Sequence, residues 1–269
     1  YISLYKGFYN GPAGYGRLSR LYGLEKLSEA VNAELIGQHL MLENEENTLV
    51  LRGFDYDASS LTPDHPDLVR LKMVNDFLND FSWKQKGPIR LIYSGGPFRG
   101  GRLYTRFQNL PKKIRAELTI DGKPTVELDY KSNHLMMLLA ILGKELPTDP
   151  YLVIANKAKA TREQAKAFFN ACLSAQDAEQ GFEACKKHKI NKALFIKLET
   201  AFASEYPEIR LYSDLGSHLQ SIEGQIALDI MVDGAKAGIP VLPVHDSFIT
   251  TTEHEEWLRE KMIFHWKDN

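Results

Sequence analysis

The sequence predicts an α+β fold, and three observations favour it. Short β-rich runs are joined by hairpin signals, while longer segments with apolar residues three and four positions apart predict helices. Strand pairs come first, then a long helical stretch, a further helix and a final hairpin, which is typical of an α+β domain with antiparallel strands. At 269 residues, 43% of them hydrophobic, the chain can bury a substantial core.

Residues 1–87 are interpreted as a mainly helical supporting region. They contain helix patterns but no recognisable catalytic or binding motif. A glycine-rich stretch opens the region, and leucines at helical spacing predict a helix over 19–35. Residues 48–54 form a short β-rich run. Residues 61–83 predict another helix, because Pro66 stands near its start and apolar residues recur at three- and four-residue steps.

Residues 88–142 hold most of the predicted strands. A strand over 88–96 ends in a turn, and a glycine pair then leads into a second strand within 98–107. The dipeptide Asp121-Gly122 lies between two β-rich runs and is typical of a hairpin turn. The apolar segment 133–143 follows as a helix, and the glycine at its end predicts where the helix stops.

Residues 143–212 are predicted to be mostly helical, and residues 213–269 return to strands. Thr161 and Gln164 form a capping-box pattern, which predicts that a helix begins there. In the last segment, a helix over 215–238 precedes a hairpin and a closing helix.

The final hairpin has an unusual turn. In the stretch 241–250, VLPVHDSFIT, three polar residues interrupt an apolar run: His245, Asp246 and Ser247. Pro243 lacks a backbone donor, so its strand is expected at a sheet edge or a bulge. A buried carboxylate without a partner is costly, so Asp246 must pair with a cationic group, bind a metal ion or stay exposed.

Asp129 and Asp246 both stand where a β-rich run stops. If their strands are neighbours, the two carboxylates converge and repel each other. A divalent cation removes that cost, and Mg²⁺ prefers carboxylates together with waters and substrate phosphates. The alternative for each aspartate is a local turn or cap, a common role for this residue type.

Positive charge is local in a chain whose formal net charge is −2. Six Lys and Arg residues and no acidic residue occur over 99–115, with aromatic residues among them, which favours a phosphate-tracking surface. The lysines over 186–192 are interpreted as a solvated helix face. Arg162 and Lys166 lie one helical turn apart and could hold a triphosphate, or equally form a solvated face.

Two cysteines and no CxxC spacing exclude a disulfide framework and predict a reducing, intracellular environment. No apolar run approaches the roughly 20 residues that a membrane helix requires. No signal peptide is visible. We therefore expect a cytoplasmic location and no membrane partner.

Four stretches in order resemble the palm and fingers of family A nucleic-acid polymerases, including phage-type single-subunit RNA polymerases. GGRLYTRFQNLP (100–111) resembles the motif before the palm that contacts the template–product duplex. VELDYKSNHLMMLLA (126–140) is similar to motif A, REQAKAFFNACLSA (162–175) to the fingers helix, and VLPVHDSFIT to motif C. The resemblance covers about residues 88–255.

This resemblance implies a role for each matching residue. Asp129 and Asp246 would be catalytic metal ligands for Mg²⁺, or Mn²⁺ in its place, with help from the backbone carbonyl of Tyr130. The implied nucleotide-binding residues are Arg162, Lys166 and His134. The implied nucleic-acid-binding residues are Arg102, Arg106, Gln220 and His245. Residues 1–87 would be thumb-like, 88–142 and 213–269 would form a right-hand palm, and 143–212 would form small fingers.

The expected function is template-directed nucleotidyl transfer from an NTP or dNTP to a 3′-hydroxyl on a DNA or RNA template-primer. Family members usually have Glu where this chain has His134, and Tyr-Gly where it has Ser174 and Ala175. The choice between DNA and RNA products therefore stays open. Two alternatives also remain: a catalytically degenerate polymerase fold that only binds nucleic acid, and a two-metal nuclease using the same two carboxylates.

Overall fold

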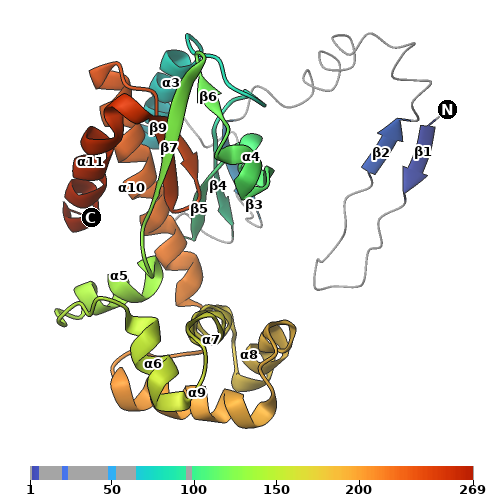
Figure 1. Cartoon of the computed structure of the whole chain (residues 1–269), viewed down its shortest axis with the longest axis vertical. Helices are drawn as coiled ribbons and strands as arrows, with labels where there is room; N and C mark the ends of the chain where they lie inside the picture. The colour runs from blue at the N-terminus through green and yellow to red at the C-terminus, as the bar shows by residue number, and fades with distance from the viewer. Residues whose placement is uncertain (1, 6–19, 24–47, 53–64, 95–98, 269) are drawn as a thin grey trace. The chain divides into compact units, whose positions relative to one another are not determined.

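The computed structural model describes residues 2–5, 20–23, 48–52, 65–94 and 99–268. The chain divides into two units, residues 1–47 and residues 48–269 (Figure 1). In the first unit, β1 (Ile2–Tyr5) pairs antiparallel with β2 (Arg20–Gly23). The helix expected over 19–35 is therefore wrong at Arg20–Gly23, and its other residues lie outside the described ones. Pairing with β1 outweighs the leucine spacing there.

The second unit contains a three-stranded sheet in the order β3-β4-β5. Its strands are β3 (Leu49–Arg52), β4 (Arg90–Ser94) and β5 (Gly100–Tyr104). All three had been predicted as strands, whereas the parallel pairing of β3 with β4 had not. Because β3 belongs to this unit, the predicted boundary after residue 87 does not coincide with the division of the chain.

A four-stranded antiparallel sheet follows, in the order β6-β7-β9-β8. Its strands are β6 (Thr119–Ile120), β7 (Lys123–Asp129), β9 (Ser247–Thr251) and β8 (Leu242–Val244). The hairpin predicted at Asp121-Gly122 is confirmed, and both residues have the positive φ that a tight two-residue turn requires, 50° and 76°. Pro243 lies on the edge strand β8, as its missing donor predicted.

Helices cover these sheets and extend beyond them. The helices nearest the sheets are α3 (Pro66–Leu78), α4 (Lys112–Arg115), α10 (Leu215–Ala237) and α11 (Glu255–Asp268), with short 3₁₀ turns at Phe107–Asn109 and Thr252–His254. The helical subdomain comprises α6 (Pro150–Ala158), α7 (Arg162–Ser174), α8 (Ala178–Cys185), the 3₁₀ turn Lys186–His188 and α9 (Lys192–Glu205). Between the two groups lies α5 (Asn133–Ile141), and α10 runs from the helical subdomain to the sheets (Figure 1).

The capping box predicted for the helical subdomain is present. The Thr161 side chain accepts from the backbone N–H of Gln164, and the Gln164 side chain accepts from that of Thr161. This reciprocal cap fixes the start of α7. Arg162 and Lys166 therefore lie in the first two turns of one well-defined helix.

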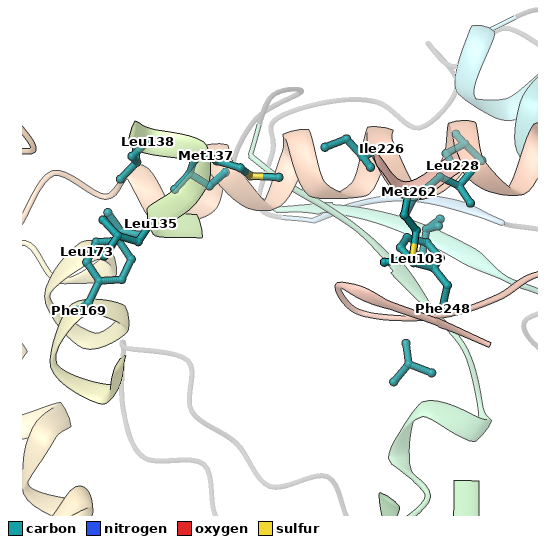
Figure 2. Packing of buried hydrophobic residues seen from close by; sticks show 14 of the residues in the cluster. Leu103, Leu135, Met137, Leu138, Phe169, Leu173, Ile226, Leu228, Phe248 and Met262 are labelled. Carbon is teal, nitrogen blue, oxygen red and sulfur yellow. The ribbon is translucent and has the colours of Figure 1, made fainter. Parts of the chain in front are cut away.

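The buried apolar residues form a continuous core that links the sheets to the helical subdomain. Figure 2 shows one group of these residues around the sheets, Leu103, Leu228, Phe248 and Met262. It shows a second group where α5 meets α7, Leu135, Phe169 and Leu173. Because α5 follows β7 after a short turn, packing in this second group fixes α7 relative to the end of that strand. None of the described helices is both long and apolar enough to cross a bilayer.

Candidate active site

Asp129 and Asp246 lie at the same end of the antiparallel sheet. Asp129 ends β7 opposite Ser247, the first residue of β9, and Asp246 occupies the turn just before β9. The backbone N–H of Tyr130 points to the carbonyl oxygen of Asp246 at 3.5 Å. The two strands are therefore neighbours, which is the condition that the sequence argument set for bringing the carboxylates together.

The electrostatics of the two aspartates show that they interact. Burial and the nearby charge of Asp246 raise the pKa of Asp129 to about 6, although its side chain still reaches solvent. Burial and the charge of Glu223 raise the pKa of Asp246. Neither aspartate forms an ion pair with any described residue. Burial and neighbouring negative charge therefore outweigh the positive charge near each carboxylate, and neither has an ion-pair partner among the described residues.

Glu223 is a third carboxylate in this site, and the sequence interpretation had not included it. It lies on α10 with only 4% of its side chain exposed. Its Oε2 accepts from Arg102 Nη2 at 3.0 Å and is 2.9 Å from His134 Nε2. Burial alone would raise its pKa, but the contacts with His134 and Arg102 lower it. Its other oxygen, Oε1, has no hydrogen-bond partner among the described residues.

A signal for Glu223 is present in the sequence. Along the helix predicted over 215–238, Leu219, Ile226 and Ile230 form an apolar stripe. Glu223 stands in that stripe, four residues after Leu219 and three before Ile226. An acidic residue on the buried face of a helix needs a partner, so this position predicts a buried ion pair or a functional carboxylate.

Close backbone packing brings Arg102 to Glu223. A Cβ on Gly224 would lie 1.7 Å from the carbonyl oxygen of Gly101, so α10 and β5 can approach this closely only with glycine there. Gly101 also has a φ of +65°, which favours glycine. The adjacent residues, Glu223 and Arg102, are thereby held at hydrogen-bond distance.

His134 and His245 are far apart in the chain, but both are influenced by the charges of the Arg102–Glu223 pair. His134, in the first turn of α5, makes the contact with Glu223 described above. His245 is exposed in the β8–β9 turn with a φ of 57°. Partial burial of its ring and the positive charge of Arg102 lower the pKa of His245. Both histidines therefore border the aspartate pair.

The two cations of α7 have different surroundings. Arg162 donates from Nε to Asp149 at 2.5 Å and from Nη2 to Ser132 at 3.3 Å, and its guanidinium lies 5.6 Å from the ring centre of Tyr151. Lys166 is exposed and forms no ion pair with the described residues, and its charge lowers the pKa of Asp129. Lys166 is thus close enough to Asp129 to influence its charge and has no ion-pair partner among the described residues, whereas Arg162 is engaged by Asp149.

The basic run 99–115 is partly neutralised within the fold. Arg99 pairs with Asp214, and Arg102 pairs with Glu223. Arg115 makes a two-pronged contact with Glu127, from Nη2 at 2.9 Å and from Nε at 3.2 Å. Those three arginines are therefore engaged by carboxylates of the protein itself. Lys112 and Lys113 stay exposed, as do the lysines over 186–192.

The three remaining predicted site residues have separate surroundings. Arg106 is exposed, and its side chain packs over Gly87. Gln220 is half-buried on α10, three residues before Glu223. The Tyr130 hydroxyl donates to the carbonyl oxygen of Met262 at 2.7 Å, which anchors the residue after Asp129 to α11.

No three His, Cys, Asp or Glu side chains of the described residues converge as a ready-made metal cage. The candidate ligands for a cation are the carboxylates of Asp129 and Asp246, which form no ion pair with the described residues. No protein-family model matches the chain, and a comparison with curated proteins finds no match.

Proposed function

We propose that this chain is a magnesium-dependent, template-directed nucleic-acid polymerase. The observation that carries the proposal is the placement of Asp129 and Asp246 at one end of adjacent strands, without ion-pair partners and beside Lys166. Hard oxygen donors in this arrangement suit Mg²⁺, which is commonly held by one or two carboxylates plus substrate phosphates. In this proposal the four-stranded sheet is the palm and α6–α9 are the fingers of an intracellular enzyme.

Each residue then has a defined task. Asp129 and Asp246 would hold the cation, and Lys166 would attract the triphosphate as a mobile point charge. Bound magnesium would neutralise phosphate charge and make the attacking 3′-hydroxyl more acidic. The contact of Glu223 with both Arg102 and His134 supports a positioning role for this carboxylate, because it fixes two side chains at the border of the site. Most of the rate enhancement would come from positioning and electrostatics.

Primer extension tests the proposal. The purified chain is given a primed DNA or RNA template, dNTPs or NTPs, and Mg²⁺ or Mn²⁺, and labelled products are sized. We expect incorporation that requires the metal and that Asp129→Ala reduces at least about a thousandfold, since removing a metal ligand removes several kcal/mol of transition-state stabilisation. Asp80→Asn, at an exposed aspartate after α3, is the matched control and should retain full activity. Full activity of folded Asp129→Ala would refute the assignment.

One observation favours a second candidate, a polymerase-like module that binds nucleic acid without catalysis. Arg162, the residue expected to grip the triphosphate, is engaged by Asp149 and Ser132. Such a module would bind DNA or RNA in a gel-shift assay and incorporate no nucleotide with either metal. Asp149→Ala separates the two candidates: freeing Arg162 should strengthen triphosphate binding in an enzyme and leave a pure nucleic-acid binder unchanged.

A further inference from the structure

The chain contains two cysteines, and the fold brings them together. Cys172 lies on α7, and Cys185 is the last residue of α8. Both are free thiols, and both side chains have no measurable exposure to solvent. They lie in the helical subdomain, and the proposed catalytic site uses neither of them.

A glycine on α8 allows the close approach. A Cβ on Gly181 would lie only 3.1 Å from the Sγ of Cys172, so this face of α8 rests directly on Cys172. Cys185 follows Gly181 by four residues and therefore projects from the same face. Cys185 therefore lies on the face of α8 that meets Cys172, close enough for each thiol to alter the pKa of the other.

The two sulfur atoms are chemically different. The neighbouring Cys172 thiol lowers the pKa of Cys185, and the charge of Lys187 acts in the same direction. The neighbouring Cys185 thiol and burial raise the pKa of Cys172. The Tyr212 ring also lies against this contact, and its hydroxyl donates to Glu199 at 2.5 Å. Cys185 is thus the better nucleophile, and Cys172 is placed as its resolving partner.

We propose that Cys172 and Cys185 are a redox-active dithiol that hydrogen peroxide converts to an intramolecular disulfide joining α7 to α8. The Cys185 thiolate attacks one peroxide oxygen, which forms a sulfenic acid and releases hydroxide. The Cys172 sulfur then attacks the sulfenic sulfur, the S–S bond forms, and the oxygen leaves as water with the thiol proton. Overall, two thiols are oxidised and one peroxide is reduced to two waters.

The consequence of oxidation is a covalent tie within the helical subdomain. Cys172 lies on the same helix as Lys166, the cation whose charge lowers the pKa of Asp129. The disulfide would hold α7 against the end of α8 and so restrict the movement of these two helices relative to each other. Peroxide is small and uncharged, and the segment after Cys185 is exposed, so local opening of this helix end gives the oxidant access.

Thiol counting on the intact native protein tests the proposal, whether or not the chain is a polymerase. The reduced protein is treated with hydrogen peroxide, quenched and denatured, and its free thiols are titrated. We expect the count to fall from two to zero, to recover with dithiothreitol, and to coincide with a 172–185 linkage in non-reducing peptide mapping. Persistence of both thiols, or their conversion only to sulfonic acids or intermolecular disulfides, would overturn the proposal.

Two serine variants test the order of the steps. In Cys172→Ser, dimedone should trap a sulfenic acid on Cys185. In Cys185→Ser, the remaining Cys172 should react with peroxide at least about fivefold more slowly, because a smaller fraction of this thiol is ionised at neutral pH. Equal reactivity in two variants with native circular dichroism would contradict the assigned roles. If either variant does not fold, the thiol count of the unmodified chain still decides the main point.

Discussion

Replacing Asp129 by Asn should stabilise the metal-free protein at neutral pH, although it removes a residue assigned to catalysis. The folded protein crowds Asp129 against Asp246 and takes away part of its hydration, so its charged form is disfavoured. An amide of the same shape carries no such penalty. A site built to hold a cation should be strained in this way when the cation is absent.

The size of the effect follows from the pKa of Asp129. It rises from an ordinary 3.8 to about 6. At 1.36 kcal/mol per pKa unit, the shift corresponds to a free-energy penalty of about 3 kcal/mol for the charged form of Asp129 in the folded protein, before screening by solvent is considered. Because the side chain reaches solvent, screening reduces the expected stabilisation by Asn to roughly 1 kcal/mol. For a unit of this size that corresponds to a rise in Tm of about 2–4 °C.

The stabilisation should depend on pH in a defined direction. Because folding raises this pKa, protonation of Asp129 stabilises the wild type fully below pH 3.8, and the benefit is lost as pH rises through about 6. The advantage of Asp129→Asn should therefore be small near pH 4.5 and complete by pH 7.5. The assay is chemical denaturation in EDTA at both pH values, repeated with Mg²⁺, which should stabilise only the wild type.

The control is Asp80→Asn, which should change stability by less than about 0.5 kcal/mol at either pH because this surface position has no described ion pair. The reasoning fails if Asp129→Asn is destabilising in EDTA at pH 7.5. It also fails if the difference from wild type is the same at pH 4.5 and 7.5, since charge crowding at Asp129 would then not be its source.

Two further predictions concern the packing that builds the site. Glu223→Ala should cost about 3 kcal/mol in chemical denaturation, because it leaves the partly buried Arg102 and His134 side chains without their acceptor. Glu223→Gln keeps one acceptor and should cost clearly less, and equal losses would contradict a charge-based role. Gly224→Ala should cost more than about 3 kcal/mol or prevent folding, since its methyl group would clash with the Gly101 carbonyl oxygen. Gly216→Ala on the same helix is the control. Its methyl group would clash only with the Ser174 hydroxyl, which can rotate away, so its effect on stability should be small.

Local sequence signals predicted most of the secondary structure. The Asp121-Gly122 turn, the Thr161 cap and the position of Pro243 follow from the backbone requirements of one or a few adjacent residues. These backbone requirements depend only on neighbouring residues, so they can be predicted from the local sequence without knowledge of the rest of the fold. The failed helix at Arg20–Gly23 is the reverse case, because pairing with a distant strand outweighed a weak local preference.

The sequence by itself determined that two aspartates stand at strand ends and that a cationic helix with a defined start lies between them in the chain. Only the tertiary structure decided which charges meet. It pairs Arg162 with Asp149, leaves Lys166 near enough to Asp129 to influence its charge, and buries Glu223 between Arg102 and His134. These contacts join residues up to 121 positions apart. Which side chains share a low-dielectric space depends on how helices and strands pack, and no local pattern encodes that.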